Sequence, residues 1–162
     1  VFSSNPPILV FSPARRVRNN TTKHTLDNCE ATKEVVINAK ALAAALEADG
    51  MRAVSGGTET HLALIDIRST GVNGKVADER CGRAGISLNK NAIPYDPETP
   101  AVTSGIRVGT PATTTQGMGI PEMSEIASFI ARAIKDGDDD AKAAAIRSDV
   151  YALTAKFPVY PR

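Results

Sequence analysis

Arg107 is the residue whose type and position point most directly to chemistry. It stands at the centre of the run Thr103-Ser-Gly-Ile-Arg-Val-Gly-Thr-Pro111, where it is a single cation in an apolar, strand-like segment flanked by glycines. A buried unpaired guanidinium is costly, so the sequence predicts an anionic partner. The planar fork suits a carboxylate held by two parallel hydrogen bonds. That carboxylate belongs either to Asp or Glu of this chain, as a structural ion pair, or to a ligand.

The stretch before Arg107 is the second candidate feature. The polar side chains of Asn89, Lys90 and Asn91 leave a predicted strand and enter a loop with three prolines between residues 94 and 100. Prolines stiffen a loop because their φ angle is fixed. We therefore expect a stiff wall that holds a flat polar ligand beside an anion clamp. The wall has no evident catalytic base, so the chemistry would come from a cofactor or from residues elsewhere.

Other constellations favour structural roles. His61 could act as a general base, but we favour a hydrogen-bonded structural histidine. The acidic run Asp138–Asp140 is predicted to be a capped, solvated helix start rather than a metal site. The basic cluster within residues 15–18 lacks interleaved aromatics, which favours a solvated tail over a phosphate contact. The sequence contains no nucleophile elbow, phosphate-cradling loop or two-histidine metal spacing.

Composition sets the protein class. The 162 residues are 42% hydrophobic and 23% charged, with a formal net charge of +1, as in a globular domain with no nucleic-acid surface. The two cysteines, Cys29 and Cys81, form no Cys-x-x-Cys pair, which argues against zinc or a disulfide framework and favours the reducing cytoplasm. The apolar run Ile8–Phe11 is far too short for a signal peptide or a membrane span. We expect a cytoplasmic protein without a membrane partner.

The elements that must position these residues follow from periodicity. Residues 1–31 show no sustained period, and we expect an irregular, poorly ordered extension there, followed by one domain over residues 32–162. Helical spacing predicts helices from Thr32 to Gly50, from Asn73 as N-cap to Gly85, from Pro121 to Gly137, and from Asp138 towards the end of the chain.

Strands are predicted at residues 51–54, 62–67 and 86–93 and around Arg107. The run 62–67 is apolar at almost every position, which is typical of a strand covered on both sides. The order of helices and strands predicts an α/β fold in which helices cover a small antiparallel or mixed sheet.

Several long motifs together resemble one family. They are Val54–His61, Ile86–Pro97, Thr103–Ala112 and Ala155–Pro161, and they resemble the C-terminal domain of serine hydroxymethyltransferase over about residues 33–162. The resemblance implies the small domain of a fold-type-I enzyme that depends on pyridoxal 5'-phosphate. It also implies transfer of the hydroxymethyl group of serine to tetrahydrofolate, giving glycine and 5,10-methylenetetrahydrofolate, by a homodimer or homotetramer.

The resemblance assigns roles to individual residues. Arg107 matches the arginine that grips the substrate α-carboxylate, and Asn91 matches an asparagine that contacts folate. Thr99, Pro100 and Ala101 stand where the family has a Ser-Pro-Phe-like folate segment, so the ring that could pack on folate is absent. Holding the carboxylate would align the breaking bond with the cofactor, which acts as electron sink.

The cofactor lysine is the main departure from the family pattern. Residues Thr21–Leu26 are similar to the family's cofactor-lysine motif with Lys and His exchanged, which would make Lys23 the Schiff-base candidate. A glycine-rich segment should follow, but Asp27, Asn28 and Cys29 stand in its place, and we interpret the similarity as chance. The large domain that holds the cofactor has no counterpart in these residues. Two hypotheses follow: part of a serine hydroxymethyltransferase, or a truncated, non-catalytic module that acts only by binding protein.

Overall fold

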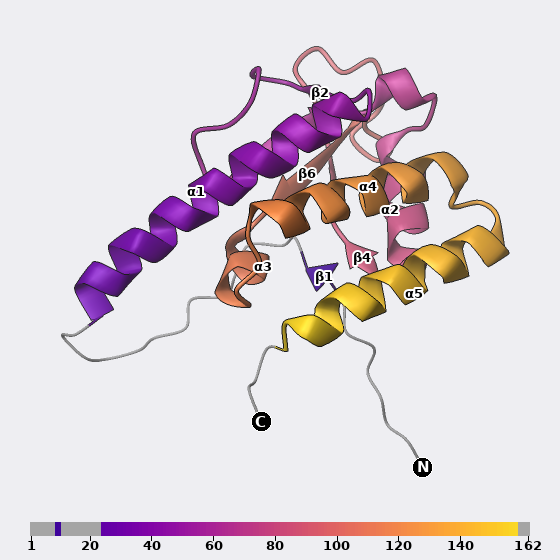
Figure 1. Ribbon diagram of the computed structural model, residues 1–162. Helices are drawn as coiled ribbons and strands as arrows, with labels where there is room; N and C mark the ends of the chain where they lie inside the picture. The colour runs from indigo at the N-terminus through magenta and orange to yellow at the C-terminus, as the bar shows by residue number, and fades with distance from the viewer. Residues whose placement is uncertain (1–8, 11–23, 159–162) are drawn as a thin grey trace.

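The structure is a computed structural model that describes the backbone of residues 9–10 and 24–158 and the side chains of residues 32–158. Its elements, in chain order, are β1 (Leu9–Val10), α1 (His24–Ala48), β2 (Arg52–Ala53), β3 (Leu62–Asp66), a 3-10 turn (Arg68–Thr70), α2 (Gly74–Arg83), β4 (Ile86–Ser87), β5 (Asn89–Asn91), β6 (Gly105–Gly109), α3 (Pro111–Thr115), α4 (Ile120–Asp136) and α5 (Asp140–Lys156). Figure 1 shows helices on one side of the strands.

The main sheet is antiparallel and has the strand order β2-β3-β6-β5. In its central pair, Ile65 lies opposite Ile106 and Leu64 lies opposite Arg107. β1 and β4 form a separate parallel pair. The α/β class with a small sheet and helical cover is therefore confirmed, and the sheet is the antiparallel form of the two that were predicted.

The core lies between the sheet and the helices. α1 and α2 contact the sheet, α4 packs against both of them, and α5 packs on α4 and α2. Ile65, Ile106, Ile126 and Ile130 are completely buried in this layer. Apolar residues recur along α4 at helical spacing, which places one continuous stripe against the core.

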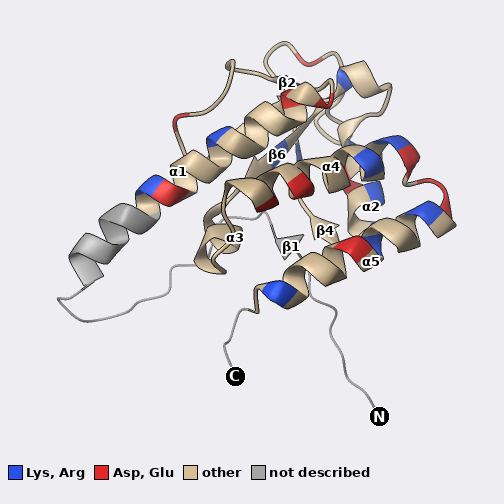
Figure 2. Cartoon of the chain, in the orientation of Figure 1, with Lys and Arg blue, Asp and Glu red and all other residues tan. Residues whose placement is uncertain are grey.

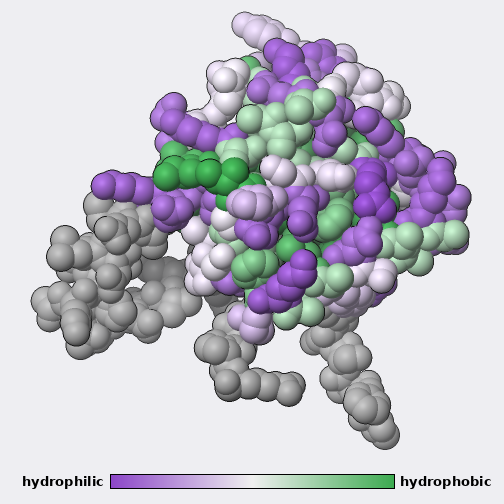
Figure 3. Space-filling model, viewed as in Figure 1, coloured by the Kyte–Doolittle hydropathy of each residue, from purple (hydrophilic) through white to green (hydrophobic). Residues whose placement is uncertain are grey.

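The outer side of the helices is polar. Figure 2 shows acidic and basic residues interspersed along α4 and α5, where pairs such as Arg132 with Asp149 form at the surface. In Figure 3 the strongest hydrophobic colour on this side lies over α1, which carries the exposed Ile37. Such single exposed apolar residues are normal on a globular surface.

Two local predictions about helix ends are confirmed. Asn73 caps α2, since its side chain accepts a hydrogen bond from the Val76 amide. Asp139 caps α5 by accepting hydrogen bonds from the amides of Ala141 and Lys142, so the acidic run is a capped helix start. Within residues 32–158 no cluster of His, Cys, Asp and Glu is arranged to hold a metal ion.

Three predictions about the elements need correction. α1 begins at His24, eight residues before the predicted start, because residues 24–31 contain no helix breaker. The predicted strand 86–93 is two strands, β4 and β5, which pair with different partners. The predicted two-sided cover of residues 62–67 is wrong: Ala63 and Ile65 are buried under helices, whereas Leu62 and Leu64 on the other face are only half-buried.

Candidate functional site

The face of the sheet that no described helix covers carries the candidate site. Directly opposed residues of antiparallel strands point to the same face, so Leu64, Arg107 and Asn89 form one row across β3, β6 and β5. The next row consists of Arg52, Asp66, Gly105 and Asn91. We call this surface the open face. It is the polar counterpart of the isoleucine-rich face beneath the helices.

Arg107 is half-buried at the centre of the open face. Among the described residues no carboxylate pairs with it, and its side chain makes no hydrogen bond to them. The structural ion pair that the sequence left open is therefore not formed within that part of the chain. A half-buried guanidinium retains its donors for an external anion, and its planar fork suits a carboxylate.

Asn91 lies diagonally across from Arg107 on the same face. Its backbone pairs with Gly105, and its Nδ2 donates to the carbonyl of Ala92 at 3.1 Å, which leaves the side-chain oxygen available. Asn89 lies directly opposite Arg107 and is therefore nearer to it than Asn91. The sequence placed Asn89 in the polar stretch before the loop but assigned it no role of its own. The alternation Asn-Lys-Asn was the available signal, since it places Asn89 and Asn91 on one face and Lys90 on the other.

The loop from Ala92 to Ser104 is organised around one carboxylate. Asp96 accepts hydrogen bonds from the amides of Ile93, Glu98 and Ser104 and from the Ser104 hydroxyl, the last at 2.6 Å. Burial raises the pKa of Asp96, but the Ser104 hydroxyl and the three amides outweigh that effect and hold the pKa at about 2. The Asp96 carboxylate thus ties the two ends of the proline-containing loop together. The binding of a flat ligand against this loop stays a prediction.

Residues Thr99, Pro100 and Ala101 lie at the exposed tip of this loop. The Thr99 carbonyl accepts hydrogen bonds from the amides of Val102 and Thr103, which form a turn. The fully exposed aromatic ring in this loop is Tyr95, whose φ of 55° lies in the left-handed region. A non-glycine residue in that conformation is uncommon, and Tyr95 lies inside a turn that is closed by the hydrogen bond from the Asp96 amide to the Ile93 carbonyl.

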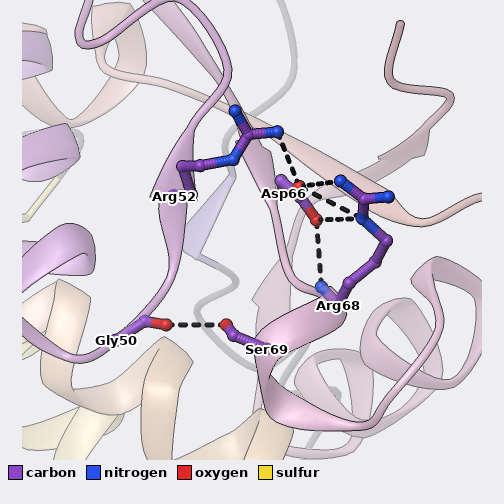
Figure 4. A pocket seen from close by; sticks show the side chains of 5 residues that line it. All are labelled: Gly50, Arg52, Asp66, Arg68 and Ser69. Atoms are coloured by element: carbon purple, nitrogen blue, oxygen red, sulfur yellow. Dashed lines mark hydrogen bonds and ion pairs between the residues drawn. The ribbon is translucent and has the colours of Figure 1, made fainter. Parts of the chain in front are cut away.

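A hollow of about 440 Å³ opens beside the same face, between β2 and the turn after β3. Gly50, Arg52, Asp66, Arg68 and Ser69 line it (Figure 4). The Asp66 carboxylate lies between two guanidiniums, which hold its pKa well below the usual range: Arg68 lowers it most, and Arg52 also lowers it against the effect of burial. This cluster was not predicted from the sequence.

The remaining candidates are not joined to this site by any hydrogen bond or ion pair among the described residues, or lie outside them. His61 is exposed and its side chain has no hydrogen-bond partner among the described residues, so the expected structural histidine is not observed. Cys81 is buried in α2, and burial raises the pKa of its thiol to about 12, so it is not a nucleophile. Lys23 and the basic cluster at 15–18 lie outside the described residues. No helix that the structure describes is long and apolar enough to cross a membrane.

The strands around Arg107 offer a guanidinium for an anion but no lysine on the open face that could hold pyridoxal phosphate. On the three strands around Arg107 the only lysine is Lys90, which pairs with Ile106 and therefore belongs to the opposite face of the sheet. A cofactor lysine thus has to come from outside these strands.

Comparison with known families identifies the family of the chain. The family model described as serine hydroxymethyltransferase matches residues 19–130, about two thirds of the chain. The match begins upstream of residue 33, where the predicted resemblance starts, and it includes Lys23, the loop 92–104 and Arg107. It ends within α4 and does not include the similarity predicted at residues 155–161. The chain belongs to the serine hydroxymethyltransferase family.

Proposed function

We propose that this chain contributes the substrate-carboxylate clamp and part of the folate-binding wall to serine hydroxymethyltransferase chemistry. The family consists of transferases of one-carbon metabolism that generally use pyridoxal phosphate. The observation that carries the proposal is Arg107, a half-buried guanidinium with no carboxylate partner in the described chain, on a face that also presents Asn89 and Asn91.

The role proposed for Arg107 is to orient the amino acid. Two parallel hydrogen bonds to the α-carboxylate of serine or glycine would fix the substrate about its Cα. Pyridoxal phosphate, when bound, supplies the electron sink for cleavage of the bond at that carbon. We propose that the family's large domain holds this cofactor, either in a longer polypeptide or as a separate chain.

For the folate side we propose that Asn91 donates or accepts a hydrogen bond and that Thr99, Pro100 and Ala101 form the nearby wall. The support is the loop geometry: Asp96 ties Ile93 to Ser104, so the loop that carries the tip is closed at the ends of β5 and β6, the strands that bear Asn91 and Arg107. Assembly with a second copy and with the large domain, as a homodimer or homotetramer, belongs to the same proposal.

An assembly experiment tests the proposal. The full chain is combined with a separately produced, cofactor-loaded large domain of a serine hydroxymethyltransferase, and conversion of serine to glycine with tetrahydrofolate is measured. Arg107→Lys keeps the charge but loses the fork, so we expect kcat/KM to fall by about 100-fold. Arg132→Lys is the matched control, because Arg132 pairs with Asp149 on the opposite, helical side, and its activity should equal that of the wild type.

The outcomes separate the two hypotheses for the chain. Equal activity of Arg107→Lys and Arg132→Lys would refute the clamp. A complex that assembles but converts no serine would favour the non-catalytic, protein-binding module. Lys23 is tested separately: after incubation with pyridoxal phosphate and borohydride, we expect mass spectrometry to find no modification specific to Lys23.

A further inference from the structure

Asp66 and Arg107 are diagonal neighbours on the open face. Asp66 of β3 lies opposite Gly105 of β6, and Arg107 is two residues further along β6. Diagonal pairs on one face of a sheet are about 7–8 Å apart, which long side chains can span. Arg107 is therefore in reach of a carboxylate that is ionised and only 6% exposed. Nevertheless, the two residues form no ion pair.

The reason is that the oxygens of Asp66 are already occupied. Arg68 donates through its amide at 3.0 Å, through Nε at 3.0 and 3.2 Å and through Nη2 at 2.7 Å. Arg52 adds a bond from Nη2 at 2.9 Å. A carboxylate has about four lone-pair positions, so these donors saturate it. Figure 4 shows the two guanidiniums on different sides of the Asp66 carboxylate.

The donors themselves are fixed by neighbouring elements. Arg52 lies on β2, directly opposite Asp66. Arg68 begins the turn after β3, and the next residue, Ser69, donates its hydroxyl to the Gly50 carbonyl at 2.6 Å. The negative charge of Asp96 also acts on the Arg68 guanidinium. Both arginines are thus positioned by the fold before any ligand binds.

We propose that Arg52 and Arg68 are positioning residues that retain Asp66 and thereby keep the Arg107 guanidinium open for a ligand carboxylate. Without Arg52 and Arg68, the nearly buried Asp66 carboxylate would lack a positive partner, which is costly. The remaining arginine on the neighbouring strand is Arg107, which would then pair with Asp66. The statement that Arg107 binds a ligand carboxylate rests on the proposed function. The statement that the arginines compete for Asp66 is independent of it.

The competition is tested by unfolding the full chain in urea. Arg107→Gln should change the unfolding equilibrium constant of the wild type by less than about twofold, since Arg107 has no partner to lose. In an Arg68→Gln background Arg107 should pair with Asp66, so the same substitution should change the constant by about tenfold. Arg132→Gln provides the control background, in which the effect should remain as in the wild type. Equal effects in all three backgrounds would overturn the inference.

Two further variants keep the test decisive. If Arg68→Gln does not fold, Arg52→Gln serves as the background, because it removes one donor to Asp66 and leaves the Arg68 pair. In that background Arg107→Gln should change the unfolding equilibrium constant by about threefold. No change in that background would also refute the inference. Arg68→Lys retains a charge beside Asp66 and should restore most of the wild-type behaviour. In NMR spectra, the Arg107 Nε–H should exchange with water more slowly in Arg68→Gln than in Arg68→Lys.

The same variants distinguish this inference from the proposed function. In the assembled enzyme, Arg68→Gln should raise the KM for serine by about tenfold, and Arg68→Lys should restore it. If the coupling to Arg107 appears in the urea experiment but Arg107→Lys leaves the KM for serine unchanged, the competition for Asp66 stands and the carboxylate clamp fails. If the coupling is absent and Arg107→Lys raises the KM, the clamp stands and the role of Arg52 and Arg68 fails.

Discussion

The two faces of the four-stranded sheet are built from the same strands but differ in chemistry. Under the helices, Ile65 and Ile106 face each other and are fully buried. One residue along each strand, Leu64 and Arg107 form the corresponding pair on the open face and are only half-buried. Because alternate residues point to opposite faces, each strand separates the residues that hold the fold from those available for binding.

The charged residues of the open face are not equivalent either. Asp66, Arg52 and Arg68 are joined by hydrogen bonds, whereas Arg107 is free of ion pairs within the described residues. A charge whose partner is fixed contributes to stability, and one without a partner can bind a ligand. Substitutions on the two faces should therefore have separable effects on unfolding and on binding.

The largest loss of stability should come from the helix-covered face. Ile65→Ala removes a fully buried side chain, and the free energy of unfolding should fall by about 2–5 kcal/mol in urea titrations. Its neighbour Leu64 is the matched control on the open face, and Leu64→Ala should cost about 1 kcal/mol. Equal losses would show that the open face is packed as tightly as the core.

Gly105 tests how closely the loop approaches the open face. A Cβ at this position would lie 2.6 Å from the Ile93 side chain and 2.9 Å from the Asn91 carbonyl oxygen. Gly105→Ala should therefore lower the free energy of unfolding by about 1–3 kcal/mol and disturb the β5–β6 pairing in amide spectra.

Gly82→Ala in α2 is the control for that substitution. Apart from the helix's own backbone and the adjacent residues, nothing lies within 4 Å of the added Cβ, so this variant should be more stable than the wild type by about 0.5–1 kcal/mol. A stable Gly105→Ala protein with unchanged β5 resonances would contradict the close approach of Ile93.

Asp96 should make stability depend on pH in the acid range. Its pKa is about 2 in the folded chain against 3.8 ordinarily, so the stability it contributes is present above about pH 4 and is lost as the pH falls to about 2. Asp96→Asn should remove about 1–2 kcal/mol at neutral pH and flatten the pH profile between 4 and 2. The measurement is urea unfolding at a series of pH values. Asp149→Asn removes the exposed pair with Arg132 and is the control: the fall in stability between pH 4 and 2 should remain as in the wild type.

The smallest effect on stability is expected at Arg107. Arg107→Met keeps a long apolar stem and removes an unpaired charge, so the free energy of unfolding should change by less than about 0.5 kcal/mol. Serine turnover by the assembled enzyme should nevertheless be lost. A destabilised Arg107→Met protein would indicate a structural partner for this guanidinium and would remove the contrast between the two faces.

Local patterns predicted much of the fold. Helical spacing located α2 and α4. The N-cap Asn73 and the acidic run 138–140 marked where α2 and α5 begin, because these signals depend on residues only a few positions apart. Periodicity could not show that helices cover one face of β3 alone. Leu62 and Leu64 are apolar, but an apolar residue type alone does not predict whether a helix will cover it or leave it partly exposed.

The candidate site was predicted in part for the same reason. Arg107 and Asn91 stand out as polar residues in or beside apolar strands, and the structure places them on one face. The Asp66 cluster depends on Arg52, fourteen positions earlier in the chain, and is created by the pairing of β2 with β3. The sequence did hold one local signal for this cluster: Asp66 ends an apolar strand and Arg68 follows two residues later, which indicates a carboxylate–arginine pair.

The ring of hydrogen bonds around Asp96 has a consequence for how ligand preference can diverge. The carboxylate ties Ile93 to Ser104 and thus closes the loop at its base, while Thr99, Pro100 and Ala101 remain exposed at the tip. Side chains at the tip can therefore be exchanged while the strands that carry Asn91 and Arg107 keep their register. Related proteins could acquire new ligand contacts at these three positions without rebuilding the sheet.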